Sequence, residues 1–234
     1  MRWVLGIIAL LIFAGGITGF WEADKNLSSF FSRENNMNVP SANIYGATEE
    51  TASPLPIAAS IQESLVESDK KIIEPIAEFS QRITKKPFGI YITPETSPVH
   101  PDKFDGYHTG VDIEYEDIAE DVPVYAIADG TVIVSKFASG YGGVTVIRHR
   151  VEEQSFLALY GHLDPASMAS AGTRVTRGQQ IAILGDGHSE ETDGARKHLH
   201  FAILKKETLD IRGYVKTEEE LAGWYDPLEF YETL

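Results

Sequence analysis

Short β-prone runs separated by glycine-containing turns fill the chain after Pro87, and they constrain its fold more than any other feature. The runs are rich in Val, Ile, Tyr and Phe, which suit a pleated, half-buried surface. They span residues 88–92, 122–128, 131–137, 143–149, 155–160, 180–184 and 198–204. Helical spacing returns only at residues 217–224. The pattern predicts an all-β domain over residues 85–234, with a sandwich or barrel-like fold.

Two segments in this region contain residue types that are typical of tight turns. Ala128-Asp129-Gly130 lies between two of the runs, where it predicts a tight hairpin. The segment 140–143 reads GYGG and offers several positions that tolerate a positive φ, so we expect a second turn there.

The first 21 residues form a separate region. Residues 3–20 read WVLGIIALLIFAGGITGF, an uncharged apolar run of about the length of a transmembrane helix. Arg2 precedes this run and Glu22 and Asp24 follow it, which predicts a single-pass anchor in the cell membrane with the C-terminal domain outside the cytoplasm. The alternative is a signal peptide with its apolar centre at residues 4–13, whose cleavage would release a secreted protein.

Residues 22–84 are predicted to form a polar linker with short helices. Residues 22–56 are rich in Ser, Asn, Thr, Glu and Pro and have few apolar residues, which is typical of a disordered tether. Between residues 57 and 83 the apolar residues show partial helical spacing, and Pro75 interrupts it.

Charge and cysteine content exclude several functions. The formal net charge is −15, with 20 Lys and Arg against 35 Asp and Glu, so we expect no nucleic-acid partner. The chain has no cysteine, which excludes disulfides and thiolate metal sites. A bound metal must therefore use nitrogen and oxygen ligands.

Four of the seven histidines fall in three short motifs. These read His108-Thr-Gly-Val-Asp112, Tyr160-Gly-His162-Leu163 and His198-Leu-His200-Phe201. In a strand, His198 and His200 would share one face while Leu199 and Phe201 enter the core. His108, Asp112 and one histidine of the His-x-His pair would give three protein ligands and an open fourth position, as in a catalytic zinc site.

The chain here resembles the lysostaphin-like or LytM-type zinc metallopeptidases, peptidase family M23. The resemblance runs from about residue 89 to residue 230 and covers the three motifs in order. It also includes the segments VYAIADGTV at 124–132, GYGGVTVIRH at 140–149 and GQQIAILG at 178–185. The resemblance implies an all-β domain of the lipoyl-like hammerhead type, an antiparallel sheet sandwich or half-barrel with a zinc-binding groove on its sheet.

The resemblance also implies roles for individual residues. It assigns zinc to His108, Asp112 and His200, and it assigns the roles of general base and hydrogen-bonding partner to His162 and His198, in either order. The implied activity is that of a monomeric endopeptidase that cuts peptide bonds of bacterial peptidoglycan, in a glycine bridge or a direct stem cross-link.

The chain departs from the family pattern at two places. The small-residue run ending in Ser-Thr-Gly-Pro is replaced by GHSEETDGARK at 187–197, and Asp105-Gly106-Tyr107 stands where an arginine is usual. The altered loop brings His188 to the expected groove wall, and Tyr141 on the glycine-rich turn is a second candidate for contact with substrate.

Two other functions remain as alternatives. The domain could be a catalytically inactive relative that binds the wall or activates another hydrolase, although loss of zinc ligands usually marks that class and none is lost here. Residues 171–182 also resemble the hammerhead turns of biotinyl and lipoyl carriers. Such carriers attach their group to a lysine at a hairpin tip, and Asp129-Gly130 occupies the best candidate tip.

Overall fold

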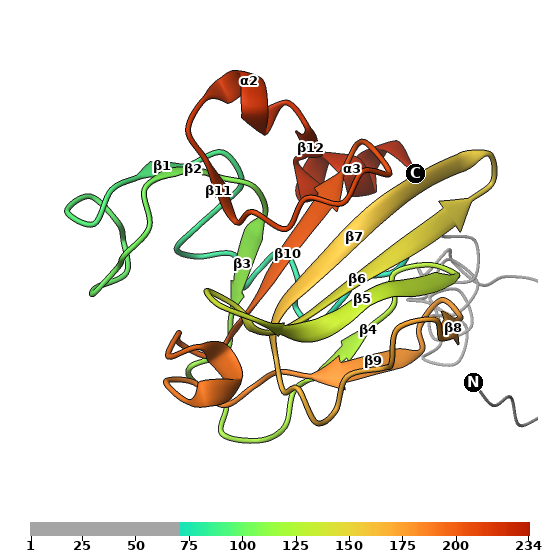
Figure 1. Ribbon diagram of the computed structural model, residues 1–234, viewed down its shortest axis with the longest axis horizontal. Coiled ribbons are helices and arrows are strands. Elements are labelled where there is room, and N and C mark those ends of the chain that lie inside the picture. Colours follow the sequence, from blue (N-terminus) through green and yellow to red (C-terminus); the bar gives the residue numbers. More distant parts are fainter. Residues whose placement is uncertain (1–70) are drawn as a thin grey trace, which may run out of the picture. The chain divides into compact units, whose positions relative to one another are not determined.

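The structure of the protein is a computed structural model, which describes residues 71–234 (Figure 1). The predicted anchor at 1–21 and the predicted linker from 22 to 70 lie outside the described residues. Within residues 71–234, none of the helices combines the length and apolar character needed to cross a bilayer.

An antiparallel sheet of seven strands, counted over the described part of the chain, forms the body of the domain. In spatial order six of its strands are β12 (Trp224–Tyr225), β10 (His198–Leu204), β7 (Gln154–Leu163), β6 (Gly142–Val151), β5 (Gly130–Ala138) and β8 (Arg174–Val175). The seventh, β3 (Val111–Glu114), pairs with the first half of β10. The long strands β5, β6, β7 and β10 lie side by side, with β3 next to β10 (Figure 1). The predicted antiparallel, β-rich domain is confirmed.

Smaller elements flank this sheet. One small sheet has the order β1 (Tyr91–Ile92), β2 (Gly106–His108) and β11 (Tyr214–Val215), and another pairs β4 (Pro123–Tyr125) with β9 (Gln180–Ile183). The helices in residues 71–234 are η1 (Glu190–Thr192), α2 (Glu218–Leu221) and α3 (Pro227–Thr233). Helix α2 falls within the predicted range 217–224, and Thr217 caps its N-terminus.

Alternation along the central strands builds two apolar clusters. On β7, Phe156 and Tyr160 belong to the larger cluster, whereas Leu157 and Leu159 belong to the smaller one. Because successive side chains of a strand point to opposite faces, the two clusters lie on the two sides of the sheet. The sheet is therefore buried on both faces at its centre, which fixes the register of β7 and β10.

The hairpin predicted at Ala128-Asp129-Gly130 is wrong. Strand β4 pairs with β9, whereas β5 pairs with β6 and β8, so the chain passes between two sheets at this point. The reason is burial, since Ala126 and Ile127 enter the larger apolar cluster and carry the chain through the core. The turn predicted at 140–143 is confirmed, because Ala138 faces Gly142 across the β5–β6 hairpin.

The segment 71–84 contains turns and no helix, unlike the short helices predicted for this end of the linker. Its apolar residues Ile72, Ile76 and Phe79 belong to the larger cluster. The main chain is held by bonds from the amide of Ile73 to the Ile127 carbonyl and from the amide of Tyr125 to the Pro75 carbonyl. The packed core therefore extends N-terminally of residue 85.

Candidate metal centre

Three strands bring the predicted ligands together. His108 ends β2, the chain turns at Thr109-Gly110, and Asp112 follows on β3 directly opposite His200 of β10. A side chain on Gly110 would meet the Phe201 carbonyl oxygen at 2.3 Å, so the turn can lie against β10 only with glycine there. Leu199 and Phe201 enter the larger apolar cluster, as predicted, which leaves His198 and His200 on the opposite face.

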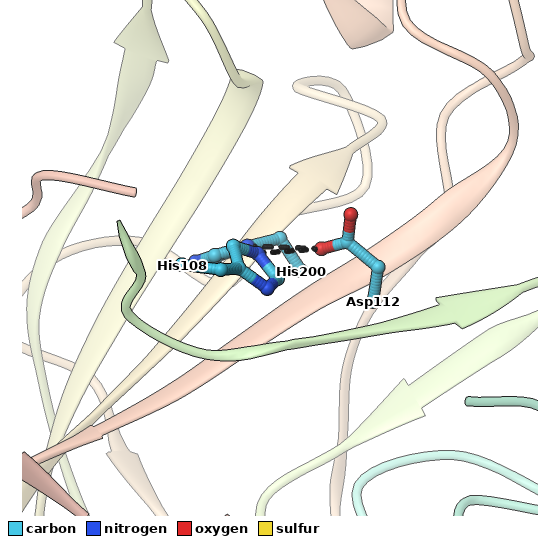
Figure 2. A group of neighbouring side chains, drawn as sticks. All are labelled: His108, Asp112 and His200. Atoms are coloured by element: carbon cyan, nitrogen blue, oxygen red, sulfur yellow. Dashed lines mark hydrogen bonds and ion pairs between the residues drawn. The ribbon is translucent and has the colours of Figure 1, made fainter. Parts of the chain in front are cut away.

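The ligand atoms of His108, Asp112 and His200 form a small triangle (Figure 2). His200 Nδ1 lies 3.0 Å from both His108 Nε2 and Asp112 Oδ1, and the third side, from His108 Nε2 to Asp112 Oδ1, is 3.2 Å. Two ligands about 2.0–2.1 Å from a tetrahedral zinc ion lie about 3.3 Å apart. The triangle therefore has nearly the size of one face of a zinc tetrahedron.

The protonation pattern of the triangle also suits a cation. His108 Nδ1 lies 3.2 Å from the Pro87 carbonyl oxygen, so the neutral ring donates from Nδ1 and has a lone pair on Nε2. That lone pair faces a carboxylate oxygen in a site where all three side chains are at most 4% exposed. Two buried acceptors in contact are unfavourable unless a positive charge lies between them. The residues present thus fit a divalent metal ion with nitrogen and oxygen ligands.

His162 and His198 lie beside the triangle with their ring centroids 4.2 Å apart. His162 Nδ1 lies 3.3 Å from the Thr192 carbonyl oxygen and His198 Nδ1 lies 2.8 Å from the Arg196 carbonyl oxygen. In the neutral tautomer each ring donates from Nδ1 and has its lone pair on Nε2. Burial, followed by the nearby His198, lowers the pKa of His162 well below its ordinary value. His162 also has a φ of 62°, a left-handed conformation that is costly away from glycine and is found mostly at functional sites.

Tyr141 and His188, the two predicted substrate contacts, both line a cavity of about 880 Å³ that also reaches Asp112, His198 and His200. Tyr141 is buried, with its ring centroid 5.6 Å from that of His162 and 5.4 Å from that of His200. Its ring occupies the space above Gly161, where a Cβ atom would come within 2.5 Å of it. The side chain of His188 is 71% exposed and lies at the rim, 3.6 Å from Glu116.

Two groups of site residues were not predicted from the sequence. Arg196 is buried and donates hydrogen bonds to both Asp112 and Glu114. The one sequence signal for this role is that Arg196 is a charged residue where the family pattern has small, uncharged residues. Tyr214 stacks on His108 with ring centroids 5.1 Å apart, and its hydroxyl accepts a hydrogen bond from Lys86. These residues come from distant segments without a recognisable motif, so only the fold brings them together.

Comparison of the sequence with models of known protein families gives a match. Residues 106–211 match the sequence model of peptidase family M23. The chain carries an M23 peptidase-family domain. The matched range begins at β2 and includes His108, Asp112, His162, His198 and His200, so every predicted ligand and acid–base histidine lies within the M23 match.

Curated relatives match only part of this chain. The murein hydrolase activator EnvC of Escherichia coli strain K12 is 35% identical over 88 residues, which are 38% of this chain and 19% of EnvC. An uncharacterised protein of Haemophilus influenzae is 34% identical over 95 residues, 40% of this chain and 21% of the relative. The matches thus span about a fifth of the length of these curated relatives.

Two solved structures are among those to which this chain is similar. A zinc-containing peptidase from Vibrio cholerae is 27% identical with a TM-score of 0.35, and the match covers 55% of this chain and 35% of that one. The structure of LytU is 23% identical with a TM-score of 0.41, and the match covers 70% of this chain and 86% of LytU.

Proposed function

We propose that this M23 protein is a zinc-dependent endopeptidase that hydrolyses peptide bonds of bacterial peptidoglycan. The observation that carries the proposal is the buried triangle of His108 Nε2, Asp112 Oδ1 and His200 Nδ1, whose sides are 3.0–3.2 Å, with two further histidines beside it. Three nitrogen and oxygen ligands are the usual protein set of a catalytic zinc, which keeps a fourth position for water or substrate.

The neighbouring residues supply the remaining chemistry of peptide hydrolysis. Zinc held by His108, Asp112 and His200 would provide the Lewis acidity that polarises a peptide carbonyl and activates water. His162 and His198 each have Nδ1 bonded to a main-chain carbonyl, which leaves Nε2 to take a proton and return it to the departing amine. His198 Nε2 lies 3.4 Å from Asp112 Oδ2, beside the proposed metal ligands. The hydroxyl of Tyr141 is buried beside the cavity and has no hydrogen-bond partner among the described residues, so its hydrogen bonding would be completed by a group that enters the site.

A second function is supported by one of the relatives. EnvC, 35% identical over 88 residues, is described as a murein hydrolase activator, so an M23 domain that activates another enzyme is the competing proposal. Its requirements differ, because an activator needs neither three convergent ligands nor a pair of histidines beside them. The presence of both sets in this chain favours the enzyme.

Digestion of purified peptidoglycan separates the two proposals. The full chain in mild detergent would be loaded with zinc and incubated with purified wall, and soluble products would be weighed by mass spectrometry. The enzyme should release fragments ending at a newly cut peptide bond, and a chelator should abolish the release. A zinc-loaded chain that releases nothing alone but accelerates an added wall hydrolase would instead support the activator.

A further inference from the structure

The carboxylate of Asp112 has different partners on its two oxygens. Oδ1 belongs to the ligand triangle, 3.0 Å from His200 Nδ1 and 3.2 Å from His108 Nε2. Oδ2 accepts a hydrogen bond of 2.9 Å from Arg196 Nη2 and lies 3.4 Å from His198 Nε2. Because neutral His198 donates from Nδ1 to the Arg196 carbonyl, its Nε2 has no proton for Oδ2, and Arg196 is the donor that holds this oxygen. A carboxylate that is bonded in this way can offer only one oxygen to a metal ion.

Arg196 is itself held in place by a second carboxylate. Glu114 lies two residues after Asp112 on β3, and its oxygens accept bonds of 2.7 Å from Arg196 Nε and 2.5 Å from Arg196 Nη2. The side chains of Arg196 and Asp112 are 6% and 3% exposed, and that of Glu114 is 11% exposed. A planar guanidinium bridging two carboxylates at such geometry is rigid, because each additional bond restricts its rotation.

We propose that Arg196, oriented by Glu114, is a positioning residue that keeps Asp112 a one-oxygen metal ligand and so fixes the coordination number of the site. The inference rests on the proposed function, since it requires that Asp112 binds metal. Groups that bond to ligating carboxylates orient them, and their loss typically lowers metal affinity by about 10–100-fold. Without Arg196, Asp112 Oδ2 would lack its hydrogen-bond donor, and the carboxylate would be able to offer both oxygens to a bound metal ion.

The test isolates the bond between Arg196 and Asp112. Glu114→Gln keeps one oxygen acceptor for Arg196, so the guanidinium should stay on Asp112 and zinc affinity should change less than about threefold. Adding Arg196→Met in that background removes the donor without leaving Glu114 as an unpaired buried charge. The double variant should raise the zinc Kd about 10–100-fold over Glu114→Gln. The readouts are zinc affinity by chelator competition and the visible spectrum after Co²⁺ substitution, both on the full chain in mild detergent.

The spectrum distinguishes positioning from general damage to the fold. Co²⁺ absorbs visible light more strongly in four-coordinate sites than in five-coordinate ones, so the double variant should lose intensity. Arg82→Gln is the matched control, because Arg82 also bonds to Glu114, through its main-chain carbonyl at 3.0 Å, but does not bond to Asp112. It should leave both readouts unchanged.

Arg196→Lys covers the case in which the double variant fails to fold. Lysine keeps the positive charge, but its single ammonium cannot bridge both carboxylates in the way a guanidinium does. It should weaken zinc binding by about 3–10-fold with a smaller loss of Co²⁺ intensity. Wild-type affinity and spectrum in Arg196→Lys or in the double variant would overturn the positioning role alone. Failure of the wild-type chain to bind zinc would overturn the proposed function and the inference together.

Discussion

His149 is a histidine that the fold keeps away from the cavity and in its neutral form. Its side chain is buried, Nδ1 lies 3.2 Å from the Asp129 carbonyl oxygen and Nε2 lies 3.1 Å from the Tyr160 hydroxyl. The ring donates from Nδ1, so the tyrosine hydroxyl donates to Nε2 and itself accepts from the amide of Ile127. All polar atoms of this small network are satisfied only while His149 is neutral.

The protonation of His149 predicts a loss of stability in acid. Burial lowers its pKa from 6.5 to about 4. Between these two pH values the unfolded chain binds a proton at His149 that the folded chain does not bind. The unfolding free energy is therefore unaffected by protonation of His149 above pH 6.5, falls as the pH drops below 6.5, and has lost the full contribution once the pH has passed the folded pKa of about 4. The full difference corresponds to about 3 kcal/mol. His149→Gln should therefore flatten the fall in unfolding free energy between pH 6.5 and 4, measured by urea titration at several pH values. An unchanged pH dependence would show that His149 does not cause the fall.

At the scale of elements, periodicity predicted strands well and their pairing poorly. Strand β10 was predicted at its true bounds because its apolar residues alternate with histidines. Strands β2 and β3 were not predicted, because each is at most four residues long and the glycine between them reads as a turn. The packing of residues 71–84 onto the core was missed for another reason. Its apolar residues follow neither a helical nor a strand period, so their burial against the larger apolar cluster can be recognised only in the folded structure.

The same reasoning applies to the site. Spacing within β10 placed His198 and His200 on one face. The ligand set of a catalytic zinc site grouped one of them with His108 and Asp112, and the family resemblance selected His200. Arg196 and Tyr214 bond to or stack on these residues through side-chain contacts between distant segments. Such contacts follow no sequence period, so they required the three-dimensional arrangement.

The segment 71–84 is predicted to be an integral part of the folded domain. Phe79 is 2% exposed, and its ring centroid lies 5.9 Å from that of Phe201 and 5.2 Å from that of Tyr231. Phe79→Ala should therefore lower the unfolding free energy by about 3–5 kcal/mol, as for other buried phenylalanines. Phe137→Ala, at a position that is 54% exposed, is the matched control and should cost less than about 0.5 kcal/mol. Equal small losses in urea unfolding would mean that the segment packs only loosely.

At the scale of the whole molecule, we propose that the apolar run at residues 3–20 holds the M23 domain at the outer face of the cell membrane. The full chain should then sediment with membranes and dissolve only in detergent, and a chain without residues 1–21 should be soluble. Fractionation followed by N-terminal sequencing measures this. A soluble protein whose first residue lies after Gly15 would instead identify the run as a cleaved signal peptide.

The central claim is that the buried histidines have two separate functions, metal binding and proton transfer. Zinc content measured beside peptidoglycan hydrolysis in Asp112→Ala, His200→Ala, His162→Ala and His198→Ala tests it most directly. Loss of Asp112 or His200 removes an atom of the triangle, so both zinc and stability should fall, because metal binding is coupled to folding. Loss of His162 or His198 should leave zinc bound while turnover falls by about 10²–10⁴-fold. If His198→Ala loses its zinc while His200→Ala keeps it, the two roles are reversed; if all four variants stay active, the hydrolase assignment is wrong.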